Sequence, residues 1–229
     1  MEDESKRNLI LIGIFAAAMA FTEAMIVYYL RKLYYTGDAL FPLNISIPLQ
    51  VISLEWIREI STIIMLIVIA LLVARKFKDR FAYFIYAFAV WDIFYYVWLK
   101  VILDWPKHLM DWDILFLIPI VWASPWIAPV ICSLIMIIIA LVIIKFPKTE
   151  IKLEEWILLV VSAIVFFASF VWDYARLWST AKSSQLDLMQ AISTYVPTGY
   201  NWLLFVMGII LSSIAILSFL RRARRHLSL

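Results

Sequence analysis

Residues 81–129 read FAYFIYAFAVWDIFYYVWLKVILDWPKHLMDWDILFLIPIVWASPWIAP, and this stretch decides the fold. It begins with an apolar run that is long enough for a helix to cross a bilayer, and Asp92 interrupts that run near its middle. A short acidic turn follows, and then come Pro119, Pro125 and Pro129. A charge at this depth needs a protein or water partner, so the stretch predicts a membrane helix beside a buried polar site.

The composition of the whole chain excludes an ordinary soluble domain. Of its 229 residues, 65% are hydrophobic and only 16% are charged, whereas soluble domains are about half apolar and a quarter charged. The net charge of +3 is too small to indicate nucleic acid as a partner, and the lipid bilayer is the expected surrounding. The single cysteine, Cys132, gives no disulfide framework.

The apolar runs predict an all-α, polytopic integral membrane protein, with a six-helix transmembrane bundle forming one domain over residues 1–229. Each run has about the 20 residues that a crossing needs. The expected helices cover about 8–30, 51–74, 81–104, 126–146, 157–178 and 202–220.

The apolar stretch from residue 113 to 146 is too long for one crossing. As a straight helix it would measure about 51 Å against a hydrocarbon core of about 30 Å. Prolines interrupt helices because they lack an amide hydrogen and clash with the preceding turn. We therefore expect a proline-broken or partly inserted segment at 113–124, before the fourth helix.

The distribution of basic residues predicts the orientation. With both termini cytoplasmic, that side holds thirteen of the twenty Lys and Arg residues, namely Lys6, Arg7, Arg75, Lys76, Lys78, Arg80, Lys145, Lys148, Lys152, Arg221, Arg222, Arg224 and Arg225. The first helix lacks a small-residue cleavage site and is expected to be retained. The sequence therefore predicts a protein of a bacterial or archaeal plasma (inner) membrane.

Four acidic residues from different predicted helices fall at a similar depth. Glu23, Glu59, Asp92 and Asp173 all belong to the outer half of the bilayer, at depths of roughly 8 to 18 Å. The inner half of the predicted helices has long runs without a charge. Because buried ionisable groups normally face the bundle interior or a cavity, this predicts a polar pocket near the outer surface.

Aromatic residues accompany these acids. The pair Trp-Asp occurs three times, at 91–92, 112–113 and 172–173, and tyrosines such as Tyr96 crowd the same region. Aromatic walls beside carboxylates suit an organic cation. The predicted ligand-binding residues are Glu23, Glu59, Asp92, Tyr96, Asp113, Trp172 and Asp173, with the loop 33–50 and the segment 113–124 as a cover.

A purely structural role for the acids is the main alternative. Arg58 can pair with Glu55 or Glu59, because spacings of three and four bring helix side chains together. Lys100 shares a predicted helix face with Asp92, and Arg176 lies three residues from Asp173. Ion pairs of this kind would neutralise the acids without any ligand.

Familiar metal and cofactor motifs are missing from the sequence. The chain has two histidines and four glycines, so it lacks the residues for a bis-histidine haem, a histidine-rich zinc site or a glycine-rich phosphate loop. A carboxylate-only site for a hard cation is a lesser alternative. No metal site is predicted, and no cofactor is identified.

These observations predict a membrane protein with an outward-facing acidic and aromatic pocket. The pocket would bind a small organic or cationic ligand and could also transport it. One alternative is an intramembrane enzyme that acts on a lipid-like substrate through paired carboxylates. Another is an accessory subunit of a larger membrane complex, in which the aromatic faces and charged pairs serve assembly or oligomer formation.

Overall fold

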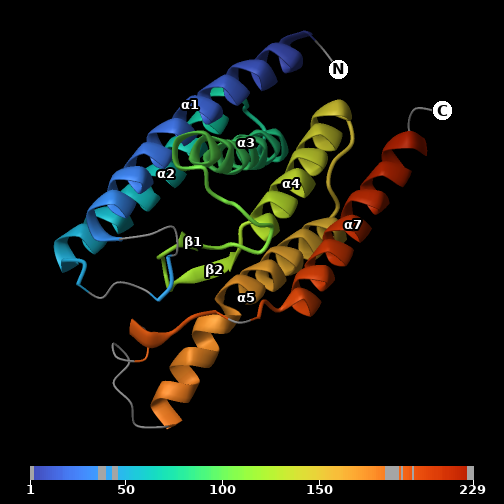
Figure 1. Ribbon diagram of the computed structural model, residues 1–229. Helices are drawn as coiled ribbons and strands as arrows, with labels where there is room; N and C mark the ends of the chain where they lie inside the picture. Colours follow the sequence, from blue (N-terminus) through green and yellow to red (C-terminus); the bar gives the residue numbers. More distant parts are fainter. Residues whose placement is uncertain are drawn as a thin grey trace.

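The computed structural model describes residues 3–35, 40–42, 46–183, 191, 193–197 and 199–225. Within these residues, six long helices and one short hairpin follow each other along the chain (Figure 1). The elements are α1 (Asp3–Tyr34), α2 (Leu49–Val73), α3 (Phe77–Leu103), β1 (Trp112–Phe116), β2 (Trp122–Pro125), α4 (Ile127–Lys145), α5 (Leu153–Ser183) and α7 (Trp202–Arg225). All six helices are long and apolar enough to cross a membrane, which confirms the predicted helical architecture at this level.

Several helices extend beyond their predicted ends. The predictions of 8–30, 157–178 and 202–220 correspond to α1, α5 and α7, each of which is longer. Bilayer thickness limits only the apolar part of a helix, and the flanking residues here include Lys, Arg and Glu, which are good helix formers. The charged ends therefore continue the helices past the apolar runs.

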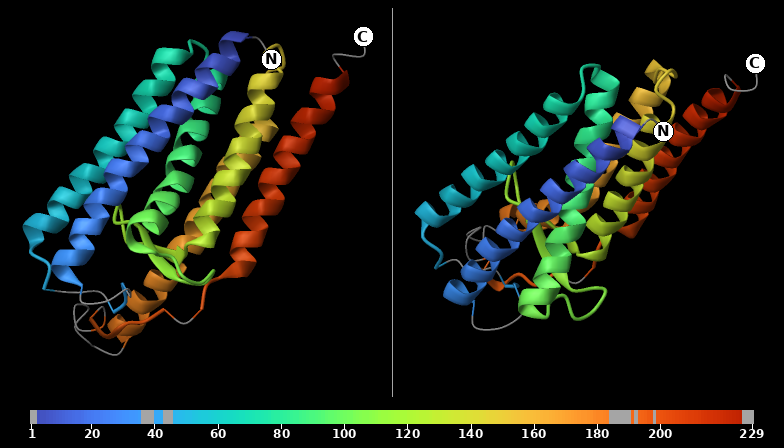
Figure 2. Two further views of the ribbon diagram at one scale, coloured as in Figure 1. Left: turned by 45° about the horizontal axis from the view of Figure 1, so that its top comes forward. Right: turned by 90° about the horizontal axis from the view of Figure 1, so that it is seen from above.

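Helix α3 lies at the centre of one half of the bundle. Helices α1, α2 and α4 all pack against it, whereas α5 pairs with α7 and α4 also contacts α7. Both termini lie at one end of the bundle, and the hairpin lies toward the other end (Figure 2). This arrangement follows from six successive helices that alternate in direction.

Small side chains allow α1 and α3 to approach closely. Ala16, Ala20 and Ala24 of α1 are completely buried, and the indole of Trp98 in α3 donates a hydrogen bond to the Ala17 carbonyl at 2.9 Å. Where lipid tails are as apolar as the side chains, close packing and hydrogen bonds drive helix association. The alanine-rich face of α1 therefore determines which side of that helix meets α3.

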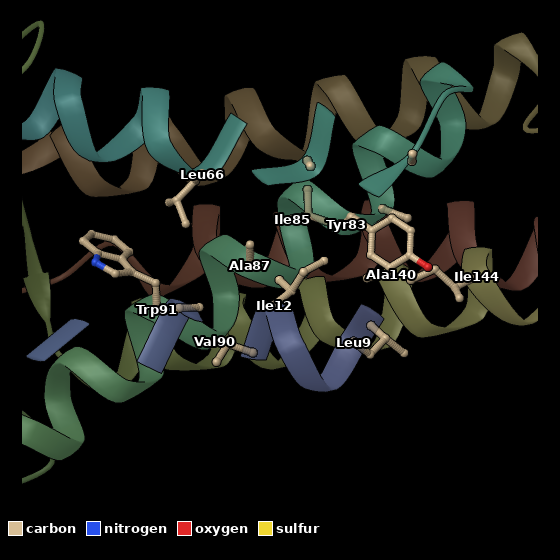
Figure 3. Packing of buried hydrophobic residues seen from close by; sticks show 14 of the residues in the cluster. Leu9, Ile12, Leu66, Tyr83, Ile85, Ala87, Val90, Trp91, Ala140 and Ile144 are labelled. Carbon is tan, nitrogen blue, oxygen red and sulfur yellow. The ribbon is translucent and has the colours of Figure 1, made fainter. Parts of the chain in front are cut away.

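The largest core cluster joins α1, α2 and α4 to α3. Figure 3 shows Leu9 and Ile12 of α1, Leu66 of α2 and Ala140 of α4 beside the buried side chains of α3. Large apolar side chains also cover the outside of the helices; Leu72, for example, is 76% exposed. Soluble monomers rarely expose extensive apolar surface, so these outer faces are suited to lipid.

The segment before α4 forms an antiparallel hairpin. Trp112 pairs with Pro125 and Asp113 with Ser124, and the register shifts between Ile114 and Phe116. The sequence predicts a break in this region but no strands, and the structure shows no proline-broken helix there. Non-helical backbone within a membrane must be buried in protein or line a cavity, and pairing two strands satisfies part of its hydrogen-bonding capacity.

The three prolines of this region occupy positions that need no amide hydrogen from a helix interior. Pro119 lies in the connection between the strands, and Pro125 ends β2. Pro129 is in the first turn of α4, where proline is tolerated because amides there have no partner within the helix. The prolines therefore help to separate the hairpin from α4.

Two predictions fall partly outside the described residues. In the loop 33–50, which was predicted to cover the pocket, residues 36–39 and 43–45 lie outside them. The spacing of Leu186, Met189 and Ile192 also predicts a short interfacial helix, and these three positions lie outside the described residues.

Candidate functional site

A cavity of about 630 Å³ lies between α1, α2, α3 and the hairpin, with two aromatic side chains of α5 at its edge. Its volume is within the range of roughly 300 to 1,000 Å³ that is usual for small-molecule sites. Five residues predicted to bind a ligand line this cavity: Glu23, Glu59, Asp92, Tyr96 and Asp113. They come from α1, α2, α3 and β1, so tertiary packing brings them together.

An ion-pair cluster joins α1 to α2 on one side of the cavity. The Arg58 guanidinium forms ion pairs with Glu23 of α1 and, at 2.9 Å, with Glu55 one turn earlier in α2. The Thr62 hydroxyl donates a hydrogen bond to Glu23. The single positive charge of Arg58 is therefore shared between two carboxylates.

Glu59 holds the hairpin against α2. Its two carboxylate oxygens accept the Leu117 backbone amide at 2.9 and 3.0 Å, and its side chain is only 5% exposed. Leu117 directly follows the last residue of β1. This hydrogen bond orients the hairpin, but the amide carries no charge that could neutralise Glu59.

Asp92 lies within α3 and is also hydrogen-bonded by a neutral donor. The Ser133 hydroxyl of α4 donates to its Oδ2 atom at 2.8 Å. Asp92 is 9% exposed and Ser133 is completely buried. The contact links α3 to α4 and leaves the charge of Asp92 without a basic partner in direct contact among the described residues.

Asp113 of β1 contacts the end of α1. Its Oδ1 atom lies 3.4 Å from the Arg31 guanidinium, which in turn lies 4.0 Å above the centre of the Trp105 ring. Both Asp113 and Arg31 are buried. Burial raises the pKa of the Asp113 carboxyl above its ordinary value, although Arg31 and the Tyr96 hydroxyl oppose this shift.

The structure places Trp172 and Asp173 outside the cavity lining. Trp172 is 43% exposed, whereas Asp173 is buried and its Oδ2 atom has no hydrogen-bond partner among the described residues. Helix α5 instead presents Tyr174 and Trp178, which are four residues apart and therefore share a face. Trp172 points away because two helix residues correspond to a rotation of about 200°.

One of the three predicted ion-pair donors, Lys100, differs from expectation. Lys100 pairs with Asp104 at 2.7 Å, at the exposed end of α3, and not with Asp92. Arg176 is exposed and interacts electrostatically with Asp173, although the buried Oδ2 atom of Asp173 has no hydrogen-bond partner among the described residues. Arg58 pairs with Glu55 as expected from their spacing, and in addition with Glu23 of another helix.

Sequence reasoning missed several lining residues, including Arg31 at the end of α1. A signal for it exists, because Glu23, Val27, Leu30 and Arg31 lie on one face of α1 at spacings of three and four. The aromatic residues Trp56, Trp91 and Tyr95 also line the cavity. Their roles depend on helix rotation, which the apolar runs alone do not determine.

The described residues contain no group of three or more His, Cys, Asp or Glu side chains placed to hold a metal ion. His108, in the turn after α3, is exposed and pairs with Asp111 at 3.4 Å. Comparison with family models, with curated proteins and with solved structures found no match for this chain.

Proposed function

We propose that this chain is an integral membrane protein with both termini in the cytoplasm and the hairpin end facing outward, in the plasma membrane of a bacterium or archaeon. The six apolar helices support membrane insertion. Thirteen of the twenty Lys and Arg residues lie at the end of the bundle that carries both termini, in or beside the connections α2–α3 and α4–α5, the N-terminal end of α1 and the C-terminal end of α7. The positive-inside rule assigns this end to the cytoplasm.

In this membrane protein the cavity binds a small organic cation. Its described lining contains five carboxyl groups, on Glu23, Glu55, Glu59, Asp92 and Asp113, against the two guanidinium groups of Arg31 and Arg58. Both guanidiniums are already paired, whereas Glu59 and Asp92 have neutral hydrogen-bond donors. The excess of acid over base favours a cationic ligand over an anionic one.

The burial of these acids strengthens the argument. A carboxylate that is removed from water is strongly destabilised unless a proton or a cation neutralises it. A ligand with one ammonium group would supply that charge between Glu59 and Asp92, which both line the cavity. The free energy of neutralising the acids then contributes to binding.

The walls of the cavity favour an organic ammonium over a bare metal ion. Aromatic side chains contribute much of the lining: Tyr35, Trp56, Trp91, Tyr95, Tyr96, Phe116, Tyr174 and Trp178. A cation over an aromatic face gains roughly 0.5 to 2 kcal/mol, and methyl groups on the ammonium would bury apolar surface at the same time. The excess of carboxylates within one aromatic cavity is the observation that carries the proposal.

The test is binding of butyltrimethylammonium to the purified protein in lipid nanodiscs, with 1-butanol and butyrate as neutral and anionic comparisons. We expect the cation to bind and both comparison compounds to bind at least about tenfold more weakly, the difference that about 1.4 kcal/mol produces. Asp92→Asn should abolish cation binding, while its amide oxygen can still accept the Ser133 hydroxyl.

Asp104→Asn is the matched control, because Asp104 is an exposed partner of Lys100 outside the cavity lining. This control should bind butyltrimethylammonium as the unmodified protein does. Equal affinity of the folded Asp92→Asn protein for the cation would refute the proposal, as would equal binding of butyrate.

A further inference from the structure

The exposure of the lining residues changes across the cavity. Leu49, Trp56 and Trp178 are 73%, 45% and 52% exposed, whereas Glu23 and Glu59 are 3% and 5% exposed. The cavity therefore has an open side and a closed side. We call the exposed lining residues Leu49, Trp56, Pro119 and Trp178 the mouth, and the buried residues Glu23, Glu59, Asp92 and Asp113 the acidic floor.

The mouth lies between two helices that do not pack closely together. Leu49 and Trp56 belong to α2, and Trp178 belongs to α5. Helix α2 packs mainly on α3 and helix α5 on α7, while the described residues show no extensive contact between α2 and α5 (Figure 2). Because lining residues of both helices face the same cavity, its opening lies on the side of the bundle.

The mouth is apolar, and most of the remaining lining is apolar as well, apart from the Arg58–Glu55 ion pair of α2 and the acidic floor. The apolar lining residues, which we call the passage, include Val51, Ile52, Ile114, Leu117, Ile120 and Val121. Leu49 and Trp56 occupy the first two turns of α2, and Glu59 lies about 15 Å from the start of that helix. Tryptophan is typical of the level where lipid head groups meet the hydrocarbon, so the mouth is placed where an amphiphile in the membrane would reach it.

We propose that the ligand is an amphiphile, a cation that carries an alkyl chain and enters head first through the mouth between α2 and α5. Its ammonium group reaches the acidic floor, and its chain remains in the apolar passage with its end at the mouth. This inference rests on the proposed binding of an organic cation and adds the class of ligand and its route.

If the ligand's alkyl chain occupies the passage, the binding affinity should increase with the length of that alkyl chain. Each methylene group that leaves water contributes enough free energy to strengthen binding up to about fourfold. A cavity built for a compact cation would show no such increase, because the extra methylene groups would remain in water or clash with the walls.

The experiment measures the affinities of butyl-, hexyl- and octyltrimethylammonium for the protein in nanodiscs made of phosphatidylethanolamine and phosphatidylglycerol, which contain no choline. Empty nanodiscs give the partitioning of each probe into lipid, which is subtracted. The octyl probe should bind at least about tenfold more tightly than the butyl probe, which allows for incomplete burial of the four added methylene groups.

The double substitution Trp56→Ala, Trp178→Ala tests the route. Both side chains are about half exposed, so the variant is expected to fold. Its octyl-to-butyl ratio should fall to about threefold or less, because the ratio cancels any loss of ammonium binding that the two probes share. Leu72→Ala is the control, because Leu72 is 76% exposed near the opposite end of α2 and outside the lining; its ratio should match that of the unmodified protein.

Three results would overturn the inference, and they are distinguishable. If the butyl probe binds but the octyl probe binds no more tightly, the ligand is a compact cation and the proposed function survives. If the increase with chain length persists in the double variant, the passage does not lead through this mouth. If no probe binds, or Asp92→Asn binds them all normally, the proposed function fails together with the inference.

Discussion

Replacing Arg58 by methionine should strongly destabilise the protein. The substitution keeps an unbranched side chain but removes the guanidinium that pairs with Glu23 and Glu55. The Glu23 side chain is only 4% exposed, whereas that of Glu55 is 15% exposed and closer to water. The main cost therefore comes from leaving Glu23 buried without its cation.

The expected loss is about 3 kcal/mol in the free energy of unfolding. Removing one partner of a buried ion pair typically costs about 3 to 5 kcal/mol, and the partial exposure of Arg58 places this pair at the lower end. The double variant Arg58→Met, Glu23→Met removes both charges and should recover to within about 1 kcal/mol of the unmodified protein, because apolar replacements of a buried pair are often neutral.

The measurement is unfolding by sodium dodecyl sulfate in mixed micelles, followed by circular dichroism, for the single and double variants. Lys6→Met serves as a control, because it removes one partner of an exposed pair with Asp3 and should change stability by less than about 1 kcal/mol. An Arg58→Met protein as stable as the Lys6→Met protein would refute the reasoning. A double variant less stable than Arg58→Met would refute it as well.

Two further predictions concern the hairpin and the contact between α5 and α7. Glu59→Gln replaces the carboxylate that holds Leu117 by a neutral amide, and hydrogen exchange at the Leu117 amide should accelerate about fivefold to tenfold; an unchanged rate would show that Glu59 does not restrain the hairpin. Gly208→Ala places a methyl group 2.7 Å from a ring carbon of Phe166. The clash should exceed the roughly 1 kcal/mol that alanine gains over glycine in helix propensity, so the free energy of unfolding should fall by a net amount of about 1 to 2 kcal/mol in the same assay. Gly13→Ala, whose added methyl group meets only a side-chain hydroxyl at 3.2 Å, should cost nothing, and equal stability of the two variants would contradict this account.

Three of the acids that were grouped from the sequence line one cavity. Glu23, Glu59 and Asp92 were grouped because they lie at similar depths, and the structure places all three around one cavity. Depth is a property of position along a helix, so it follows from counting residues. Asp113 was included for its neighbouring tryptophan, and it reaches the same cavity through a strand that the sequence analysis did not predict.

Asp173 shows where such prediction fails. It lies at a suitable depth, but the face that α5 turns toward the cavity carries Tyr174 and Trp178. The rotation of α5 about its axis depends on its packing with α7, where Gly208 lies against Phe166. No pattern within residues 153–183 alone determines that packing.

The hairpin illustrates the same limit for the backbone. The prolines and the length of the apolar run predict that helix must stop before α4, because a longer helix would exceed the bilayer. Which structure replaces it depends on distant groups, since Glu59 of α2 binds the Leu117 amide next to β1. The pairing of Asp113 with Ser124 likewise joins residues that local propensity does not connect.

The sequence by itself determined the six long apolar helices of the described residues, their approximate bounds and the positions of the acids along them. These properties follow from the free energy of transferring each run of residues into an apolar medium, which is a sum over neighbours along the chain. The tertiary structure alone decided helix rotation, the hairpin, the pairing of Arg58 with Glu23 and the position of the mouth between α2 and α5. Those features depend on contacts between residues that are distant in the chain, so they cannot be calculated from neighbouring residues alone.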